Sequence, residues 1–335
     1  GFLPERIDPA LDRPPSPAEA ERIRCAGCGA KAAPDILAEE VRRLGGTPPS
    51  HPEVRAGLEA AEDAALVEAA PGVLEARTID YLPAFCDDPY LFGRIVAVHA
   101  ASDLHAMGAA PRTALVLAVL PYAEKGPFAR DLRMLMAGIA REAAREGIAV
   151  VGGHTSEGPS LAAGLAVSGR CGPEPPFRKG ALRPGDCLVL AKPLGTGTIL
   201  AADMRARAEG AWLAAAYGAM LRSNGPAAAV LRRHGVLAAT DVTGFGLAGH
   251  LLEMLEASGC GARLDLSAIP LLPGASESLA AGFRSSRDPA NRRQAEGALG
   301  RPLPPGGPAD ILFDPQTSGG LLAGVPSDRL DAVLR

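Results

Sequence analysis

The chain has 335 residues, of which 47% are hydrophobic and 21% charged. This length favours two domains, and the composition is typical of a globular protein with enough apolar residues to fill a core. The formal net charge of −4 and the aromatic content of 4% argue against a nucleic-acid partner, because they indicate neither a basic surface nor stacking platforms. No apolar run reaches membrane-spanning length, so we expect no membrane partner.

The first 22 residues differ in composition from the rest of the chain. Residues 1–22 are rich in proline and charge, and they lack the basic start and apolar stretch of a signal peptide. We interpret them as a linker or tail, with fusion to an upstream domain as one explanation. The six cysteines are thinly spread, which predicts free thiols in a reducing cytoplasm.

Strand-like and helical patterns alternate in the first half of the chain. In order, the patterns predict a helix from Pro34 to Gly45, a strand at 73–81, a helix at 92–109, a strand at 112–121, a helix at 129–147, a short buried strand at 148–153 that runs into a glycine turn, and a strand at 161–169. Prolines and glycines in 172–186 then break the pattern. We therefore expect an N-terminal domain at 23–180 and a C-terminal domain at 181–335.

The second half repeats this alternation. It predicts a strand at 187–195, a helix at 197–208, a strand at 236–242, a helix at 246–259, a strand at 262–267, a mobile polar segment at 283–309, and a strand, a turn and a strand over 310–325. The last residues resemble the start of a helix with no returning strand. We interpret that end as truncated.

The stretch "CAGCGAK" contains Cys25, Cys28 and Lys31. A structural zinc site normally needs four ligands, and the chain has no second C-x-x-C pair. A thioredoxin-like pair would follow a strand, whereas a polar tail precedes this one. Two incidental thiols in a flexible loop remain an alternative. Lys31 favours chemistry, because an ammonium group would lower the pKa of a nearby thiol or bind a phosphate.

Four aspartates lie at the ends of apolar strands or on an apolar helix: Asp63, Asp80, Asp103 and Asp241. An ionised carboxylate in such surroundings needs a cation or a hydrogen-bond network to offset its desolvation. A single aspartate of this kind is more often a helix cap or a turn residue. Four of them favour a divalent-metal cluster, and oxygen ligands suit Mg²⁺ beside nucleotide phosphates.

Glycine-rich turns follow several predicted strands, at 150–159, 192–198, 241–250 and 314–320. Their backbone N–H groups could bind phosphates at a helix start, although most glycine turns are only turns. No Walker loop and no complete dinucleotide fingerprint is present. His154 lies in the first turn and is a site candidate, whereas we interpret His99, His105 and His250 as structural.

Together these stretches resemble the selenophosphate synthetase (selenide, water dikinase) family, within the aminoimidazole ribonucleotide synthetase superfamily. The matching motifs run from about residue 23 to the C-terminus: "GCGAK", "EDAA", "TIDYLPAFCDDPYLFGRIVAVHAASDLHAMGA", "GGHT", "KPLGTG", "SNGPAA", "DVTGFGLAGHLLEM" and "FDPQTSGGLL". The resemblance implies an α+β protein of two α/β domains. The N-terminal domain would bind ATP and dimerise, and the C-terminal domain would be an α/β sandwich.

The resemblance also implies roles for individual residues. Cys28 falls on the family's catalytic cysteine or selenocysteine, and Lys31 on its essential lysine. The metal ligands would be Asp63, Asp103 and Asp241, and the nucleotide would contact Lys31, Asp80, Asp103, Gly152, Gly153, His154 and Thr155. The family's loop often has a second cysteine directly before the lysine. Ala30 stands there in this chain, which excludes a dithiol role.

The family reaction converts ATP, hydrogen selenide and water into selenophosphate, AMP and phosphate. It implies Mg²⁺ as cofactor, with K⁺ as a second candidate cation, and a homodimer in the cytoplasm. The main alternative is another ATP-dependent enzyme of the superfamily, such as thiamine-phosphate kinase, which is not expected to carry the loop from Cys28 to Lys31. A selenium or metal carrier and a redox protein using Cys25 and Cys28 are further alternatives.

Overall fold

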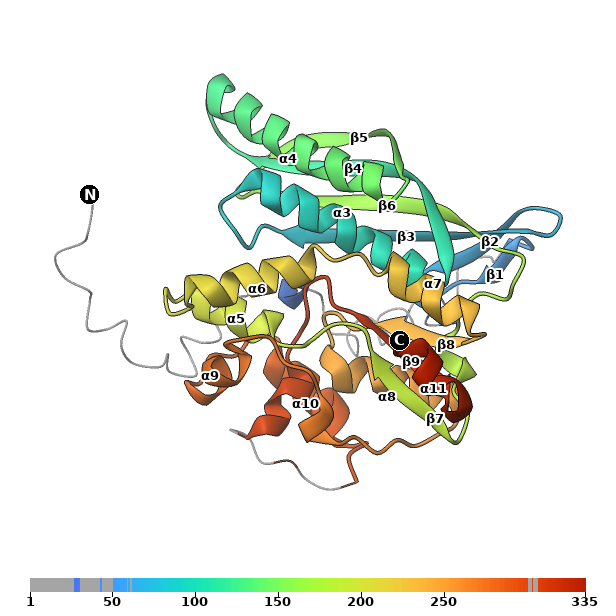
Figure 1. The fold of residues 1–335 in the computed structure, drawn as a ribbon. Coiled ribbons are helices and arrows are strands. Elements are labelled where there is room, and N and C mark those ends of the chain that lie inside the picture. Colours follow the sequence, from blue (N-terminus) through green and yellow to red (C-terminus); the bar gives the residue numbers. More distant parts are fainter. Residues whose placement is uncertain are drawn as a thin grey trace.

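The computed structural model describes residues 27–30, 43, 51–58, 60, 62–300, 303 and 307–335. These residues form two units, each with its own sheet and hydrophobic core, and the first unit lies above the second in Figure 1. No helix in the described ranges is long and apolar enough to cross a membrane. The predicted helix after Pro34 lies outside the described residues apart from Arg43, which is helical.

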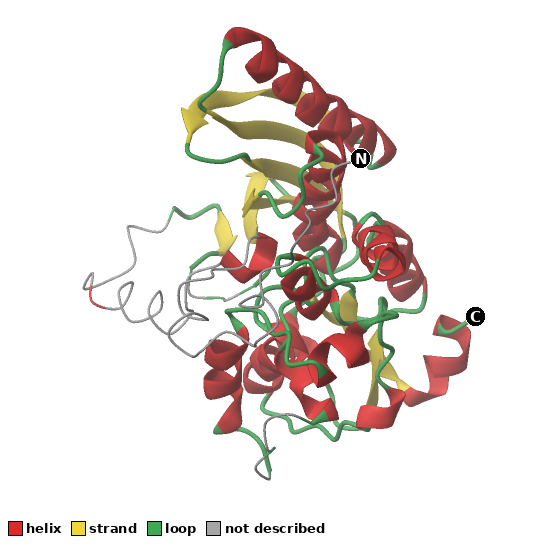
Figure 2. Cartoon of the chain, turned by 90° about the vertical axis from the view of Figure 1, so that its left-hand side faces the viewer, coloured by secondary structure: helices red, strands yellow, loops and turns green. Residues whose placement is uncertain are grey.

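The first unit is a six-stranded sheet with the strand order β1-β2-β3-β6-β4-β5. Its elements are β1 (Val54–Ala56), β2 (Ala65–Ala70), β3 (Val73–Pro83), α3 (Pro89–Ala106), β4 (Ala109–Pro121), α4 (Lys125–Arg145), β5 (Ala149–Gly158) and β6 (Ala162–Cys171). All neighbours pair antiparallel except β4 and β5, because α4 carries the chain back to the same end of the sheet. Figure 2 shows the helices of this unit on one side of the sheet.

The alternation of side chains along β3 explains the two faces of this sheet. Asp80 and Leu82 are buried under α3, whereas Ile79 is 70% exposed and Tyr81 47% exposed on the opposite face. The strand pairing places Ile79, through Ala166 of β6, in one row with the exposed Leu115 of β4. The outer face of the sheet therefore carries apolar side chains that no helix among the described residues covers.

Helix α3 is apolar around most of its circumference because it packs against the sheet, α4 and the second unit. Asp88 caps its start by accepting hydrogen bonds from the backbone N–H groups of Tyr90 (2.8 Å) and Leu91 (3.2 Å). Glycines let α3 and α4 approach closely. A Cβ atom at Gly93 would lie 2.3 Å from Leu135 O, and one at Gly138 would lie 2.1 Å from Tyr90 O.

The second unit is a three-stranded sheet, ordered β7-β9-β8, surrounded by helices (Figure 1). Its elements are η3 (Lys179–Ala181), β7 (Asp186–Leu190), α5 (Thr196–Asp203), α6 (Gly210–Met220), α7 (Gly225–Arg233), β8 (Ala238–Asp241), α8 (Gly246–Ser258), η4 (Leu266–Ala268), α9 (Ala275–Ala280), α10 (Asp288–Glu296), η5 (Pro308–Phe313), β9 (Leu321–Pro326), η6 (Ser327–Arg329) and α11 (Leu330–Val333). Most strands and helices predicted from the alternation of patterns are confirmed.

Several predictions for local structure are wrong. The strand predicted at 148–153 is neither short nor buried: β5 is an exposed edge strand that continues through the predicted glycine turn to Gly158. Residues 262–267 are a loop and the start of η4 rather than a strand. The strand predicted at the start of 310–325 is the 3-10 helix η5, in which buried Asp310 pairs with Arg284 and Arg292. The segment 283–309 contains α10.

The glycine-rich turns of the second unit hydrogen-bond to one another. Gln316 Oε1 accepts hydrogen bonds from Gly195 N (2.9 Å), Thr196 N (3.2 Å) and Thr196 Oγ1 (3.2 Å), so it caps the start of α5. Asp314 Oδ2 accepts from Gly197 N (3.2 Å), and Gln316 N donates to Thr243 O (2.8 Å). The backbone N–H groups of the turn at 192–198, which the sequence offers as phosphate ligands, thus donate to the side-chain oxygens of Gln316 and Asp314.

Because Gly138 provides the contact between α3 and α4, we expect Gly138→Ala to lower the free energy of unfolding by about 2 kcal/mol, despite the better helix propensity of alanine. Urea titration followed by circular dichroism would measure it. Gly126→Ala on the same helix is the control, because its Cβ would meet nothing within 4 Å. Equal stability of the two variants would contradict the packing argument.

Gln316 generates a second prediction. We expect Gln316→Ala to lower the free energy of unfolding by about 3 kcal/mol, because three buried donors at the start of α5 lose their acceptor. Thermal unfolding would report the loss. The control is Gln294→Ala, which truncates a half-buried glutamine of α10 and should cost less than about 1 kcal/mol. A cost at position 316 no larger than at 294 would refute the capping role.

Candidate active site

Two of the four aspartates lie where β3 meets α3. Thr78 Oγ1 of β3 donates a hydrogen bond to Asp103 Oδ2 of α3 at 2.5 Å. One helical turn earlier, His99 Nε2 lies 3.7 Å from Asp80 Oδ2. The i, i+4 spacing of His99 and Asp103 places both on the helix face that meets β3. His99 therefore contacts Asp80 of the strand.

Asp241 approaches α3 from the second unit. It ends β8, is 2% exposed, and accepts a hydrogen bond from Ser102 Oγ at 2.6 Å. Asn224 Nδ2 donates to the same Ser102 Oγ (2.9 Å) and to Gly319 O (2.9 Å). Because Ser102 directly precedes Asp103 on α3, this network joins the second unit to the helix that carries Asp103.

Asp63 completes the group from the segment before β2. Its Oδ1 accepts a hydrogen bond from Thr240 Oγ1 at 2.9 Å and lies 3.0 Å from Lys179 Nζ. Its Oδ2 is buried and has no hydrogen-bond partner among the described residues. Burial raises the pKa of Asp63 to about 6, with Lys179 opposing the shift and the negative charge of Asp241 adding to it. We call Asp63, Ser102, Asp103, Thr240 and Asp241 the seam cluster, since it lies between the two units.

The oxygen atoms of the seam cluster are suitable ligands for a hard divalent cation. Its carboxylates are oxygen ligands of the kind Mg²⁺ prefers, and the buried Asp63 Oδ2 leaves a ligand position open. In the part of the chain that the structure describes, no three His, Cys, Asp or Glu side chains stand at metal-ligating spacing. Mg²⁺ typically takes one or two carboxylates and completes its shell with water and phosphate oxygens. The cluster fits that mode of binding.

A buried lysine faces the seam cluster and was not singled out from the sequence. Lys192 is 3% exposed and its Nζ donates to Ser318 O at 2.9 Å. Burial lowers the pKa of Lys192 to about 7, although Asp241 and Glu146 oppose this shift. In the sequence this lysine stands only as part of the glycine turn "KPLGTG". Its burial depends on the packing of the two units and leaves no local signal.

The stretch that the sequence predicts to bind the nucleotide, Gly152–Thr155, lies apart from Asp80 and the seam cluster. Gly152, Gly153, His154 and Thr155 are exposed residues within β5, so their prediction as a turn is wrong. His154 pairs with Leu117 of β4, in a row with Tyr81 on the outer face of the sheet. Asp80 points to the opposite face, and β5 is three strand spacings, about 14 Å, from β3. One copy of the chain does not bring them together.

The cysteine loop approaches the boundary of the two units. Gly27–Ala30 forms the 3-10 helix η2, and a Cβ atom at Gly27 would lie 2.8 Å from Thr317 Oγ1 and 3.3 Å from Phe85 Cδ1. Thr317 belongs to the second unit and Phe85 follows β3 of the first. The side chain of Cys28, and Cys25 and Lys31 entirely, lie outside the described residues.

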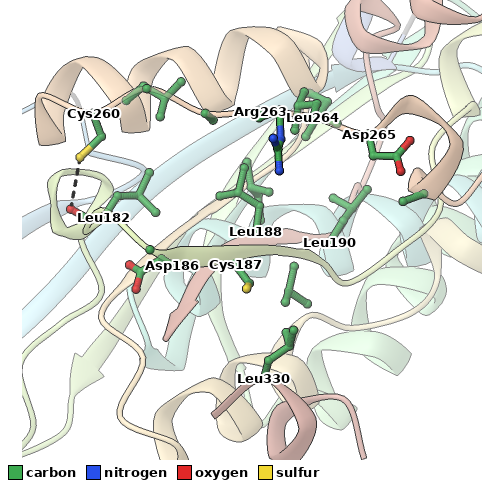
Figure 3. Close-up of a pocket in the computed structure, with 18 of the residues that line it drawn as sticks. Leu182, Asp186, Cys187, Leu188, Leu190, Cys260, Arg263, Leu264, Asp265 and Leu330 are labelled. Atoms are coloured by element: carbon green, nitrogen blue, oxygen red, sulfur yellow. Dashed lines mark hydrogen bonds between the residues drawn. The ribbon is translucent and has the colours of Figure 1, made fainter. Parts of the chain in front are cut away.

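A cavity of about 770 Å³ lies beside β7, away from the seam cluster. Figure 3 shows Leu188 and Leu190 of β7 facing the loop of Arg263 and Leu264, with Leu330 on the other side of the strand. None of the described candidate site residues lines this cavity. The candidate active site is therefore the seam cluster, which is polar, and the apolar cavity beside β7 is separate.

Comparison with known proteins identifies the family. Residues 61–171 match the AIR synthase related protein, N-terminal domain, and residues 183–335 match its C-terminal domain. A selenide, water dikinase of Nitratidesulfovibrio vulgaris (strain DP4) is 39% identical over 315 residues, which are 92% of this chain and 88% of the relative.

Solved structures at lower identity share the fold. The thiamine monophosphate kinase of Aquifex aeolicus aligns with a TM-score of 0.63 at 17% identity, over 88% of this chain and 89% of that one. The hydrogenase maturation protein HypE in complex with ATP aligns with a TM-score of 0.55 at 18% identity, over 91% and 82%. The sequence match to the dikinase is far stronger over a similar span. This chain therefore belongs to the selenide, water dikinase family of phosphotransferases, built from two AIR synthase related domains.

Proposed function

We propose that this chain converts ATP, selenide and water into selenophosphate, AMP and phosphate. The observation that supports this most directly is the seam cluster, where Asp63 and Asp241 meet the helix that carries Asp103. Phosphoryl transfer depends mainly on positioning and charge neutralisation, so buried carboxylates between two domains suit a cation-bound polyphosphate. The dikinase relative at 39% identity favours selenide as the acceptor.

Asp63, Asp103 and Asp241 are the proposed Mg²⁺ ligands, with one or two of these carboxylates on any one ion and water and phosphate oxygens completing its shell. K⁺ is a second candidate cation. When bound, Mg²⁺ would neutralise charge on the phosphate oxygens. The neighbouring side chains orient the carboxylates. Thr240 donates to Asp63, Ser102 to Asp241 and Thr78 to Asp103, so each carboxylate has one fixed oxygen.

In the proposed reaction, selenide attacks the γ-phosphorus in line and displaces ADP. Water then cleaves the bond between the two phosphates of ADP and yields AMP and phosphate. Cys28 would present the selenium, and Lys31 would bind the phosphates. The contact of η2 with Thr317 and Phe85 supports a loop that closes over the boundary of the two units.

Thiamine-phosphate kinase is the second candidate function. It shares the fold, but the kinase of Aquifex aeolicus is only 17% identical to this chain. That chemistry gives no role to the thiol of Cys28 or to selenide. The acceptor substrate therefore distinguishes the two functions.

We predict that Cys28→Ser abolishes selenide-dependent turnover while ATP still binds, because the hydroxyl of serine is not ionised as a thiol is near neutral pH. Phosphorus NMR of the protein with ATP, Mg²⁺ and selenide under strict reduction measures this. AMP and a selenium-bonded phosphorus signal should appear together with the unaltered chain and should both be absent with Cys28→Ser. Cys25→Ser is the control and should retain full activity. Normal turnover by Cys28→Ser would remove the proposed role of this thiol.

We further propose that the chain is a homodimer that pairs through the outer face of the first sheet. Ile79, Tyr81 and Leu115 expose apolar side chains there, and a second copy with the same row would bury them.

The free cysteines among the described residues, at 86, 171, 187 and 260, fit a reducing compartment such as the cytoplasm.

The proposed dimer leads to a further prediction. Ile79→Asp should convert the protein to a monomer, because a charge would be buried in the apolar contact. Light scattering coupled to size-exclusion chromatography would give the mass. Met134→Asp, on an exposed position of α4, is the control and should leave the mass unchanged. An Ile79→Asp protein with the mass of the unaltered chain would place the interface elsewhere.

A further inference from the structure

A lysine outside the proposed ligands contacts the seam cluster. Lys179 is 7% exposed and begins η3, directly after the segment that connects the two units. Its Nζ lies 3.0 Å from Asp63 Oδ1 and 2.8 Å from Glu253 Oε2 of α8. One ammonium group therefore bridges a carboxylate of the first unit and a carboxylate of the second.

The backbone around Lys179 fixes its position. Lys179 N donates to Glu62 Oε2 (3.1 Å), and Ser258 Oγ donates to Lys179 O (3.2 Å). The preceding residue, Arg178, donates its N–H to Leu237 O (2.9 Å) and so runs beside β8. These contacts anchor the residue on both sides, so the ammonium group is directed at Asp63 by the fold rather than by chance.

The charges around Asp63 explain why a cation is needed there. Asp63 and Asp241 repel each other, and Glu253 adds a third carboxylate on the other side of Lys179. His250 Nδ1 lies 3.6 Å from Glu253 Oε2. Buried carboxylates without a compensating cation are costly. Lys179 supplies that compensation in the protein without bound metal.

The two oxygens of Asp63 have different surroundings. Oδ1 accepts a hydrogen bond from Thr240 Oγ1 and forms an ion pair with Lys179 Nζ, whereas Oδ2 has no hydrogen-bond partner among the described residues. A cation at Oδ2 would stand next to the ammonium group on Oδ1, and the two positive charges would repel. Glu253 weakens that repulsion by sharing the ammonium group.

The geometry points to Lys179 as an internal counter-cation of Asp63. It keeps the Asp63 carboxylate ordered and weakens the affinity of Asp63 for a metal ion when no nucleotide is bound. Glu253 sets the strength of this effect, because it shares the ammonium group with Asp63. Metal then binds well only when the phosphates of the nucleotide bring further negative charge. Lys179 is a positioning residue, since it acts through Asp63. This inference rests on the proposed function, in which Asp63 binds the metal.

The test measures binding of Mn²⁺ alone to the metal-free protein by electron paramagnetic resonance. Lys179→Met should bind Mn²⁺ at least about tenfold more tightly, because a unit positive charge within a few ångströms of the ion is removed. Glu253→Gln should bind Mn²⁺ more weakly, because the ammonium group of Lys179 is then no longer shared with a second carboxylate and opposes the metal at Asp63 with its full charge. Lys179→Arg retains the charge and should keep the affinity of the unaltered chain.

The matched control is Arg178→Met. Arg178 is the neighbour of Lys179 and makes its own ion pair with Glu62 at 2.8 Å, but it does not contact Asp63. Its removal should leave Mn²⁺ affinity unchanged. A purely structural role for Lys179 would lower thermal stability in both lysine and glutamate variants without opposite shifts in affinity, and that result would overturn the inference.

Asp63→Asn separates this inference from the function on which it rests. Loss of Mn²⁺ binding in that variant, with unchanged affinity in Lys179→Met and Glu253→Gln, would reject the role of Lys179 alone. Unchanged Mn²⁺ binding in Asp63→Asn would reject the metal site itself. If Lys179→Met fails to fold, Glu253→Gln still decides, because weaker binding supports the inference and equal or tighter binding contradicts it.

Discussion

The contact between α3 and β8 is the constraint on which the candidate site depends. Ser102 of α3 donates to Asp241 of β8, and Asn224 donates to Ser102 and to a backbone carbonyl of the second unit. These bonds are buried, so losing any one of them would leave polar atoms without partners in an apolar setting. These hydrogen bonds therefore contribute to the relative position of the two units, and with it to the spacing of the carboxylates.

Charge balance is the second feature of this boundary. The site collects carboxylates from both units, and two buried lysines of the second unit, Lys179 and Lys192, lie near them. A buried charge is tolerated only with a partner or a bound ion. The arrangement is thus suited to exchanging internal positive charge for the charge of a cation bound to phosphates.

Two of the glycine-rich motifs have a structural role within the second unit. Those at 192–198 and 314–320 bind each other through Gln316 and Asp314, which cap α5. Burial raises the pKa of Asp314 to about 8, although its hydrogen bonds with Gln316 and with backbone N–H groups oppose the shift. These residues support the second unit from which Asp241 extends, and their glycines allow the close approach of the turns.

The sequence by itself determined the long elements, such as α3 and β3, because their periodicity extends over many residues, and it determined the family through motifs spread along the chain. It also singled out Asp63, Asp103 and Asp241. Only the tertiary structure decided that Gly152–Thr155 form an exposed edge strand, because an edge differs from a buried strand in its neighbours and not in its own residues. The same holds for Lys179, whose partners Asp63 and Glu253 lie far from it in the chain. Such a contact leaves no local pattern, because long-range packing alone brings these charges together.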